Sequence, residues 1–279
     1  MTLTLDDAVR KLRRDPQAKD LVRNSYLDWD SGEAAKRFAR SSEFSTVLKL
    51  LGGRLSAYEI LDLGAGTGIA AAAFVRAGAK KVIAVEPDGS DEVGRGAARR
   101  HISSAVTLCD GVGEELPVAD TSIDVVYTRQ VLHHTSDLRA VMREVQRVLR
   151  PNGIFLATRE HVVDSDQQLA EFLENHPIHR LAGGENAYRL AEYLDAIHAS
   201  GLHIENVIGP WDSVINAFPA VRSQRELDHL GKVLLRHRFP RCGHILCYVP
   251  GIVPIIEARA RKQRFPGRLY SFLARRPGH

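Results

Sequence analysis

The stretch Ile60-Leu61-Asp62-Leu63-Gly64-Ala65-Gly66-Thr67-Gly68 decides the fold of this 279-residue chain. An apolar run from Tyr58 to Leu63 predicts a buried parallel strand, and three glycines at alternate positions predict a tight turn before a helix that begins at Ile69. Glycine is needed where the backbone takes a positive φ or where a ligand contacts the main chain closely. Asp62, near the strand end, places a carboxylate where a cationic or hydroxylated ligand group can sit.

A second apolar segment, Lys81–Val85, ends in Glu86, 18 residues after Gly68. In doubly wound sheets, an acid at the end of the second strand accepts hydrogen bonds from ribose hydroxyls. The glycine spacing is G-x-G-x-G rather than the G-x-G-x-x-G that seats a pyrophosphate. The two segments together therefore predict a ligand that has a ribose but no phosphates.

Four more motifs continue this pattern along the chain. They are Gly113-Glu114-Glu115-Leu116-Pro117, Ser122-Ile123-Asp124-Val125-Val126, Leu132-His133-His134 and Arg150-Pro151-Asn152-Gly153. With the glycine turn, they resemble the D-x-G-x-G-x-G, A-E-x-L-P, S-F-D-V-V, L-H-H and L-K-P-G-G patterns of the class I S-adenosylmethionine-dependent methyltransferases, here of the type 11 methyltransferase-like domain. The resemblance covers about residues 58–160. It implies S-adenosylmethionine as the cofactor and S-adenosylhomocysteine as its product.

The resemblance also implies an α/β fold, a Rossmann-like sheet of seven mostly parallel strands whose last strand is antiparallel, with helices on both faces. The expected strands are 58–63, 81–86, 106–108, 122–127, 154–158, 202–208 and 268–274. The expected helices after the first strand include 138–149, 190–199, 224–236 and 253–262. We expect a helical cap at 1–54, a cofactor-binding core at 55–210 and 266–279, and a helical insertion at 211–265 before the last strand.

The family pattern implies a set of cofactor-binding positions in this chain. They are Asp62, Gly64, Ala65, Gly66, Gly68, Glu86, Pro87, Asp110, Val112, Gly113, Glu114, Thr128 and Arg129. One position departs from the pattern, because the family usually has an aspartate, which holds the adenine amino group, where this chain has Val112. Two alternatives stay open: Asp110 takes that role if the loop is shifted, or the backbone of Val112 and Gly113 holds the adenine.

The acceptor should lie beyond the carboxyl ends of the fourth and fifth strands, where ligands bind in open α/β sheets. An O-methylation needs a base there, and we predict His161 first and His133 second. The residues expected to contact the acceptor are Tyr26, Trp29, His134, Arg159, His176, His179, Asn186 and Tyr188. His176 and His179 have ligand-like spacing, but Pro177 between them argues against a regular helical turn, so no metal site is predicted.

The polar composition of these segments indicates the class of acceptor. Aromatic residues make up 6% of the chain, which favours a small hydroxylated acceptor, anionic or glycan-like, over a flat aromatic one. We therefore expect O-methylation of a saccharide-like or natural-product molecule. The alternative is a lipid-borne acceptor, because the apolar segment His244–Ile256 lies in a basic region: residues 220–279 carry 13 Lys and Arg against 3 Asp and Glu. Such a region predicts peripheral membrane contact.

Other sequence features weigh on the remaining classes. A nucleic-acid methyltransferase is a further alternative because of the basic C-terminal region, but no N-P-P-Y signature follows the fourth strand, where the chain reads Tyr127-Thr128-Arg129-Gln130, so no nucleic-acid partner is expected. The three cysteines form no metal-ligand pattern, which favours a reduced, cytoplasmic protein. The first residues lack the basic and apolar regions of a signal peptide, and no apolar run reaches the ~18–20 residues of a membrane span.

Overall fold

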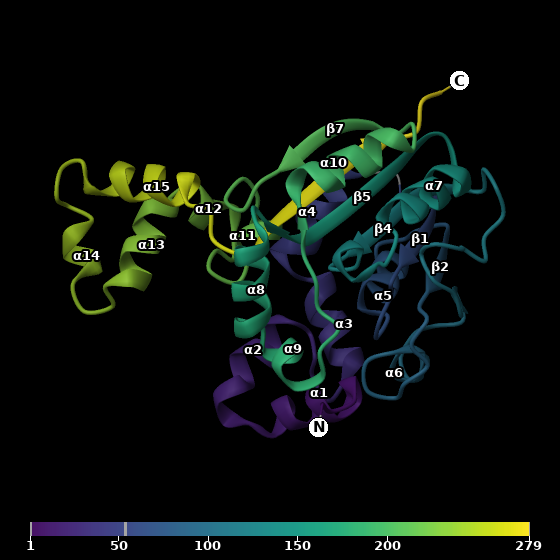
Figure 1. Cartoon of the computed structure of the whole chain (residues 1–279), viewed down its shortest axis with the longest axis horizontal. Coiled ribbons are helices and arrows are strands. Elements are labelled where there is room, and N and C mark those ends of the chain that lie inside the picture. The colour runs from purple at the N-terminus through teal and green to yellow at the C-terminus, as the bar shows by residue number, and fades with distance from the viewer. Residues whose placement is uncertain (1, 53–54, 279) are drawn as a thin grey trace.

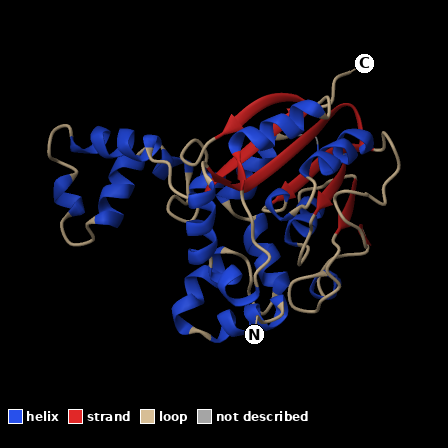
Figure 2. Cartoon of the chain, viewed as in Figure 1, coloured by secondary structure: helices blue, strands red, loops and turns tan. Residues whose placement is uncertain are grey.

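The structure, a computed structural model, describes residues 2–52 and 55–278 and centres on one twisted sheet (Figures 1 and 2). The strands lie in the order β3-β2-β1-β4-β5-β8-β7. Their bounds are β1 (Glu59–Leu63), β2 (Lys81–Val85), β3 (Val106–Cys109), β4 (Ile123–Arg129), β5 (Leu149–Val163), β7 (His203–Ile208) and β8 (Arg268–Arg275). The strands β1 to β5 pair in parallel, whereas β8 runs antiparallel to both β5 and β7. This confirms the predicted fold class.

Two strands differ from the sequence prediction. An eighth strand, β6 (Tyr188–Arg189), pairs in parallel with Val162 and Val163 of β5, and its two residues are too short for any periodic pattern. β5 itself is much longer than the predicted 154–158, because it continues past a bulge between Ala157 and Glu160 in its pairing with β8. Arg159 inside this bulge has φ +62°, so the strand bends without ending.

Helices cover both faces of the sheet because each presents an apolar stripe to it. On one face lie α7 (Leu138–Val148) and α10 (Leu190–Ala199), and on the other lie α3 (Ser31–Ala39), α4 (Ser42–Leu50) and α5 (Ile69–Arg76). In α7, the buried residues Leu138, Val141, Met142, Val145 and Val148 recur at helical spacing. Asp137 caps this helix by accepting a hydrogen bond from the Ala140 amide at 2.9 Å.

The N-terminal helices meet a segment from the middle of the chain below the carboxyl ends of the strands (Figure 1). The N-terminal part contains α1 (Leu5–Arg14) and α2 (Lys19–Asn24), and the segment after β5 forms α8 (Asp166–Asn175) and α9 (Pro177–Ala182). The Leu3 amide donates a hydrogen bond to the Leu181 carbonyl at 2.9 Å, and Arg13 forms an ion pair with Glu92, between β2 and α6 (Arg95–Arg99). The two segments therefore cover the same end of the sheet.

The residues before the last strand form five short helices. These are α11 (Val214–Ala217), α12 (Gln224–Leu227), α13 (Leu230–Arg238), α14 (Gly243–Leu246) and α15 (Ile252–Lys262). The predicted single helix 224–236 was wrong, since the chain breaks at Asp228 and His229 between α12 and α13. Ile215 of α11 belongs to the core beside the sheet, whereas α13 to α15 extend to one side as an arm (Figure 1). The domain boundaries at 54, 210 and 265 stay a prediction.

Within the parts of the chain that the structure covers, no helix is both long and apolar enough to cross a membrane.

Candidate active site

The glycine turn after β1 has the backbone geometry that only glycine adopts easily. Gly64, Gly66 and Gly68 have φ values of +67°, +51° and +77°. A Cβ atom added to Gly64 would lie 2.5 Å from a methyl group of Val131, so this position has no room for a side chain. The turn is fixed to β2, because the Gly64 amide donates to the Val85 carbonyl at 2.8 Å and the Gly66 amide donates to Glu86 Oε2 at 2.7 Å.

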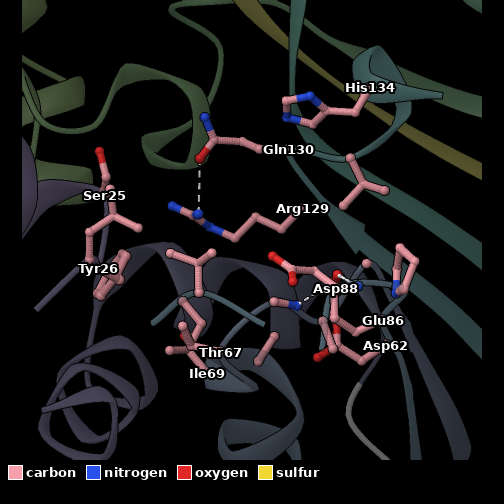
Figure 3. A pocket seen from close by; sticks show the side chains of 18 of the residues that line it. Ser25, Tyr26, Asp62, Thr67, Ile69, Glu86, Asp88, Arg129, Gln130 and His134 are labelled. Carbon is pink, nitrogen blue, oxygen red and sulfur yellow. Dashed lines mark hydrogen bonds between the residues drawn. The ribbon is translucent and has the colours of Figure 1, made fainter. Parts of the chain in front are cut away.

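Two carboxyl groups face the space beside this turn (Figure 3). Asp62 is 2% exposed, and burial together with the nearby Glu86 raises its pKa to about 7, although the Ala71 amide donates a hydrogen bond to Oδ2 at 2.8 Å. Burial also raises the pKa of Glu86, against the hydrogen bonds that its carboxylate accepts from the amides of Asp88 and Gly66. Neither carboxylate has a cationic partner within salt-bridge distance in the described residues, so the site favours a positively charged or hydroxylated ligand.

A cavity of about 390 Å³ opens between the glycine turn, the end of β4 and the N-terminal helices. Seven residues predicted to bind cofactor line it, namely Asp62, Gly64, Ala65, Gly66, Glu86, Pro87 and Arg129. It also contains Tyr26 and His134, which were predicted to contact the acceptor. Residues that the sequence analysis missed complete the lining, namely Leu5, Ser25, Leu27, Thr67, Ile69, Ala70, Asp88, Val93, Gln130 and Val131. Six of these residues directly precede or follow a predicted position in the sequence, which was the available signal: Ser25, Leu27, Thr67, Ile69, Asp88 and Gln130.

Six predicted cofactor positions lie outside this cavity. Both oxygens of Asp110 accept hydrogen bonds from Arg95 at 2.7 Å, and its side chain is 73% exposed. Glu114 accepts hydrogen bonds from the Ser136 amide and hydroxyl at 3.1 Å. The remaining four, Gly68, Val112, Gly113 and Thr128, do not line the cavity either. The position of Asp110 gives no support to its predicted contact with adenine.

A smaller cavity of about 170 Å³ shares Ser25, Leu27, Gln130 and His134 with the first one and therefore adjoins it. Its other walls are Leu21, His133, His161, His176, Pro177, Ile178 and Glu185. Four histidines from three separate segments of the chain thus meet beside the larger cavity. The sequence predicted all four as functional residues, but it gave no sign that Glu185 joins them.

The hydrogen bonds of His161 and His133 identify the ring nitrogens that remain free. Nδ1 of His161 donates to the Gly267 carbonyl at 2.8 Å, and Nδ1 of His133 lies 2.7 Å from Oε2 of the buried Glu160. Since a carbonyl and a carboxylate accept, both Nδ1 atoms carry the hydrogen and both Nε2 atoms present a lone pair. Burial lowers the pKa of His161 to about 3 and that of His133 well below its ordinary value, so both rings are neutral.

The guanidinium groups of the two predicted site arginines, Arg129 and Arg159, are bound by other protein groups. Arg129 borders the larger cavity, but its Nε donates to Glu43 at 2.7 Å and its guanidinium lies over the ring of Tyr26. Arg159 was expected to face the acceptor and lies outside both cavities. Its guanidinium donates to the backbone carbonyls of Ile215 and Phe218, and burial lowers its pKa to about 10. The bulge in β5 turns this side chain toward α11 instead.

Four predicted acceptor residues also lie outside both cavities. The Tyr188 hydroxyl donates to the Thr135 carbonyl at 2.6 Å, which fixes it to the loop before α7. Trp29 is 56% exposed beside Arg13. His179 and Asn186 line neither cavity. Their predicted contact with an acceptor stays a prediction without support from their positions.

Comparison with known proteins agrees with this geometry. A family profile for the methyltransferase domain (Methyltransf_11) matches residues 61–157. An uncharacterized methyltransferase of Mycolicibacterium gilvum is 33% identical over 196 residues, which make up 69% of this chain and 70% of that protein. This chain belongs to the class I S-adenosylmethionine-dependent methyltransferases.

Several other methyltransferases match shorter segments of the chain. The uncharacterized methyltransferase YcgJ of Bacillus subtilis is 34% identical over 142 residues, 50% of this chain and 54% of that protein. The glycine/sarcosine/dimethylglycine N-methyltransferase of Actinopolyspora halophila is 37% identical over 111 residues, 38% of this chain and 19% of that protein. The chain therefore spans about half, or less, of the length of these curated relatives.

Solved methyltransferase structures share the fold at low sequence identity. A Haloferax volcanii methyltransferase, solved with its Trm112 activator, covers 92% of this chain and 99% of its own at a TM-score of 0.56 and 16% identity. A geranyl diphosphate methyltransferase, solved with geranyl diphosphate and sinefungin, covers 92% of this chain and 84% of its own at a TM-score of 0.57 and 16% identity. At these identities the similarity establishes the fold alone.

Proposed function

We propose that this protein transfers the methyl group of S-adenosylmethionine to a hydroxyl group of a small polar acceptor. The observation that carries the proposal is the pair of adjoining cavities, one beside the glycine turn and its two carboxyl groups, the other lined by histidines. The larger cavity lies within the ~300–1,000 Å³ range of small-molecule sites. The shared residues Gln130 and His134 mark where the two ligands would meet.

The residues of the larger cavity fit the chemical groups of S-adenosylmethionine. Each oxygen of Glu86 accepts one backbone hydrogen bond and keeps a lone pair for a ribose hydroxyl. Asp62 offers a buried carboxylate that forms no ion pair with any residue described by the structure, which suits the positive charges of the methionine part. The absence of a side chain at Gly64 and Gly66 lets the ligand approach the backbone closely.

The acceptor side requires alignment and a place for one proton. The bound cofactor supplies an activated methyl group on its sulfonium sulfur. In the transfer, the carbon–sulfur bond breaks, a carbon–oxygen bond forms, and the hydroxyl proton passes to His161 Nε2. A neutral imidazole suffices, because the oxygen becomes strongly acidic as it gains the methyl group. His133, whose ring centroid lies 4.8 Å from that of His161, is the second predicted base, and the hydrogen bond from His161 to Gly267 holds the ring in place.

The experiment has two stages. Calorimetric titration with S-adenosylmethionine and S-adenosylhomocysteine should show binding to the wild type, and Glu86→Ala should lose it. Mass-spectrometric screening of hydroxylated acceptors should then find a methylated product, which His161→Ala should form at least 100-fold more slowly with cofactor affinity unchanged. The exposed His198→Ala serves as the matched control. Unchanged rates in His161→Ala would overturn its role as the base.

The names of the relatives give no common acceptor. They include N-methyltransferases of glycine derivatives, a malonyl-[acyl-carrier protein] O-methyltransferase of Xylella fastidiosa and a ubiquinone/menaquinone C-methyltransferase of Rubrivivax gelatinosus. Relatives that share this core thus methylate nitrogen, oxygen and carbon. Our choice of a polar acceptor therefore rests on the histidines and Glu185 of the smaller cavity.

A second candidate, a lipid-borne acceptor at a membrane surface, is favoured by the arm of α13 to α15. Ile245, Tyr248, Val249 and Ile255 are exposed large apolar residues there, and the last turns of α13 and α15 are basic. Apolar side chains beside arginines suit an anionic lipid surface. Co-sedimentation with vesicles of phosphatidylserine and phosphatidylcholine should then exceed that with phosphatidylcholine alone and should fall in Tyr248→Ser. Equal sedimentation of the wild type and Tyr248→Ser with the anionic vesicles would rule out this candidate.

A further inference from the structure

Three side chains at the wall between the two cavities direct metal-ligand atoms at one point. His133 and His134 belong to the short turn Leu132–His134 after β4, and Glu185 lies in the loop before β6. Oε2 of Glu185 lies 3.8 Å from His133 Nε2 and 3.7 Å from His134 Nε2. One nitrogen or oxygen from each of the three residues lies within 4.8 Å of the others.

The hydrogen bonds around this cluster leave no donor at its centre. Nδ1 of His133 is taken by Glu160 at 2.7 Å, and Nδ1 of His134 lies 3.2 Å from the Gly184 carbonyl. A carboxylate and a carbonyl accept hydrogen bonds, so each ring carries its hydrogen on Nδ1 and directs a lone pair from Nε2 toward Glu185. Two imidazole lone pairs and a carboxylate oxygen then face one another. A cation placed between these three acceptors would be attracted by all of them.

The distances are close to those of a bound ion. A tetrahedral ion with bonds of about 2.0–2.1 Å separates its ligand atoms by about 3.3 Å. The Glu185 oxygen, 3.8 Å and 3.7 Å from the two histidine nitrogens, would have to approach each by about 0.4–0.5 Å, and the two nitrogens lie within 4.8 Å of each other. The cluster is enclosed on one side and open on the other, since the side chains of His133 and Glu185 are 1% and 9% exposed and that of His134 is 42% exposed. Two imidazoles and one carboxylate form a ligand set for divalent transition metals that leaves coordination positions open.

The surroundings of the cluster resemble the outer shell of a metal site. Glu160, which is fully buried, orients His133 and also accepts the backbone amides of Val131 at 3.1 Å and His133 at 3.2 Å. A carboxylate that holds the distal nitrogen of a histidine ligand is the usual arrangement in metal sites. His176 Nδ1 lies 3.6 Å from Oε1 of Glu185, but it accepts a hydrogen bond from the His179 amide at 3.4 Å and so offers no free lone pair to an ion.

We propose that His133 Nε2, His134 Nε2 and the Glu185 carboxylate form a binding site for one divalent transition-metal ion. Glu185 is separated from the adjacent His133 and His134 by about 50 residues of sequence, and the sequence analysis considered only His176 and His179 as possible ligands. His134 also borders the larger cavity, beside Gln130 in Figure 3. An ion there would have open coordination positions for the acceptor. This role toward the acceptor rests on the proposed function, whereas the metal site itself does not.

The test measures metal binding without cofactor or acceptor. Calorimetric titration of chelator-treated, desalted protein with Zn²⁺ should show one ion per chain. Glu185→Gln and His134→Ala should each weaken binding at least tenfold, and Glu160→Gln should weaken it 10- to 100-fold. The exposed His198→Ala should leave it unchanged. The thermal melt of each variant establishes that it is folded, and His134→Ala is the variant least expected to disturb folding, since its side chain is 42% exposed.

Two results would overturn the metal site. One is the absence of Zn²⁺ binding to the wild type at 100 μM, and the other is equal affinity in the wild type, Glu185→Gln and His134→Ala. The second result would mean that the ion binds elsewhere on the surface. Methyl transfer is measured separately, so a failed metal site leaves the proposed function standing, and a failed acceptor screen leaves the metal site standing.

Discussion

Replacing Asp62 by asparagine should raise the free energy of unfolding of the protein and lower its affinity for S-adenosylmethionine. The ordinary pKa of this carboxyl group is 3.8, and burial raises it to about 7 in the folded protein. This difference in pKa lowers the free energy of unfolding by about 4 kcal/mol when Asp62 is ionised. Asparagine keeps an oxygen for the Ala71 amide, removes the charge, and so removes this penalty.

The sign of the pH dependence follows from the raised pKa. The folded protein binds the Asp62 proton more tightly than the unfolded chain, so the penalty is small below pH 4, grows by about 1.4 kcal/mol per unit as the pH rises to 7, and is constant above. Asp62→Asn should therefore be more stable than the wild type by about 4 kcal/mol at pH 8 and by about 1.5 kcal/mol at pH 5.

Thermal melts without ligand at these two pH values test the prediction. With about 2.1 cal/mol/K of unfolding entropy per residue, the 279 residues give ~0.6 kcal/mol per degree, so the Tm at pH 8 should rise by about 7 °C. Affinity for S-adenosylmethionine should fall at least tenfold by calorimetry, because the carboxylate that faces its positive charge is lost. The exposed Asp195→Asn should change neither quantity. A lower Tm in Asp62→Asn, or the same rise at both pH values, would refute the reasoning.

Three further substitutions test other parts of the site. Gly64→Ala should lower the Tm and abolish cofactor binding in calorimetry, because the added Cβ meets a Val131 methyl at 2.5 Å and φ is +67°; normal binding would contradict the role of the turn. Glu43→Gln should destabilise the protein by about 3–5 kcal/mol in urea denaturation, since it leaves the buried Arg129 unpaired, and a loss below 1 kcal/mol would count against the ion pair. Asp110→Asn should keep cofactor affinity within twofold, because Asp110 lies outside the cavity, and a larger loss would restore its predicted adenine contact.

The sequence predicted those features of the fold that depend on neighbouring residues. The glycine turn, Glu86 and the central strands are each specified by a short pattern, and the structure places Asp62 and Glu86 together as expected. The sequence did not predict the elements that depend on strand pairing between segments far apart in the chain. Tyr188 and Arg189 form a strand only because β5 extends past its bulge to meet them.

The candidate site shows the same division. Glu185 has an ordinary loop sequence around it, and it becomes part of a cluster only when the loop before β6 returns to the turn after β4. The partner of Arg129 is Glu43, 86 residues away in the chain, so no local pattern indicates that this arginine of the cavity wall is held in an ion pair. Such contacts depend on packing, and no spacing rule along one segment describes them.

The two cavities share four residues, but their other walls come largely from different parts of the chain, and this division bears on how the protein can evolve. The glycine turn, Asp62 and Glu86 lie within residues 61–157, the segment that the domain family shares. Most walls of the smaller cavity lie outside it, at Leu21 of α2 and the residues just after this helix, at His161 near the end of β5, and on the segment from His176 to Glu185. Mutations of His161, His176 or Glu185 can therefore alter the chemistry of the smaller cavity without changing a residue that lines the larger one. An ancestral gene with this layout can diversify by drift in its flanks while selection preserves its centre.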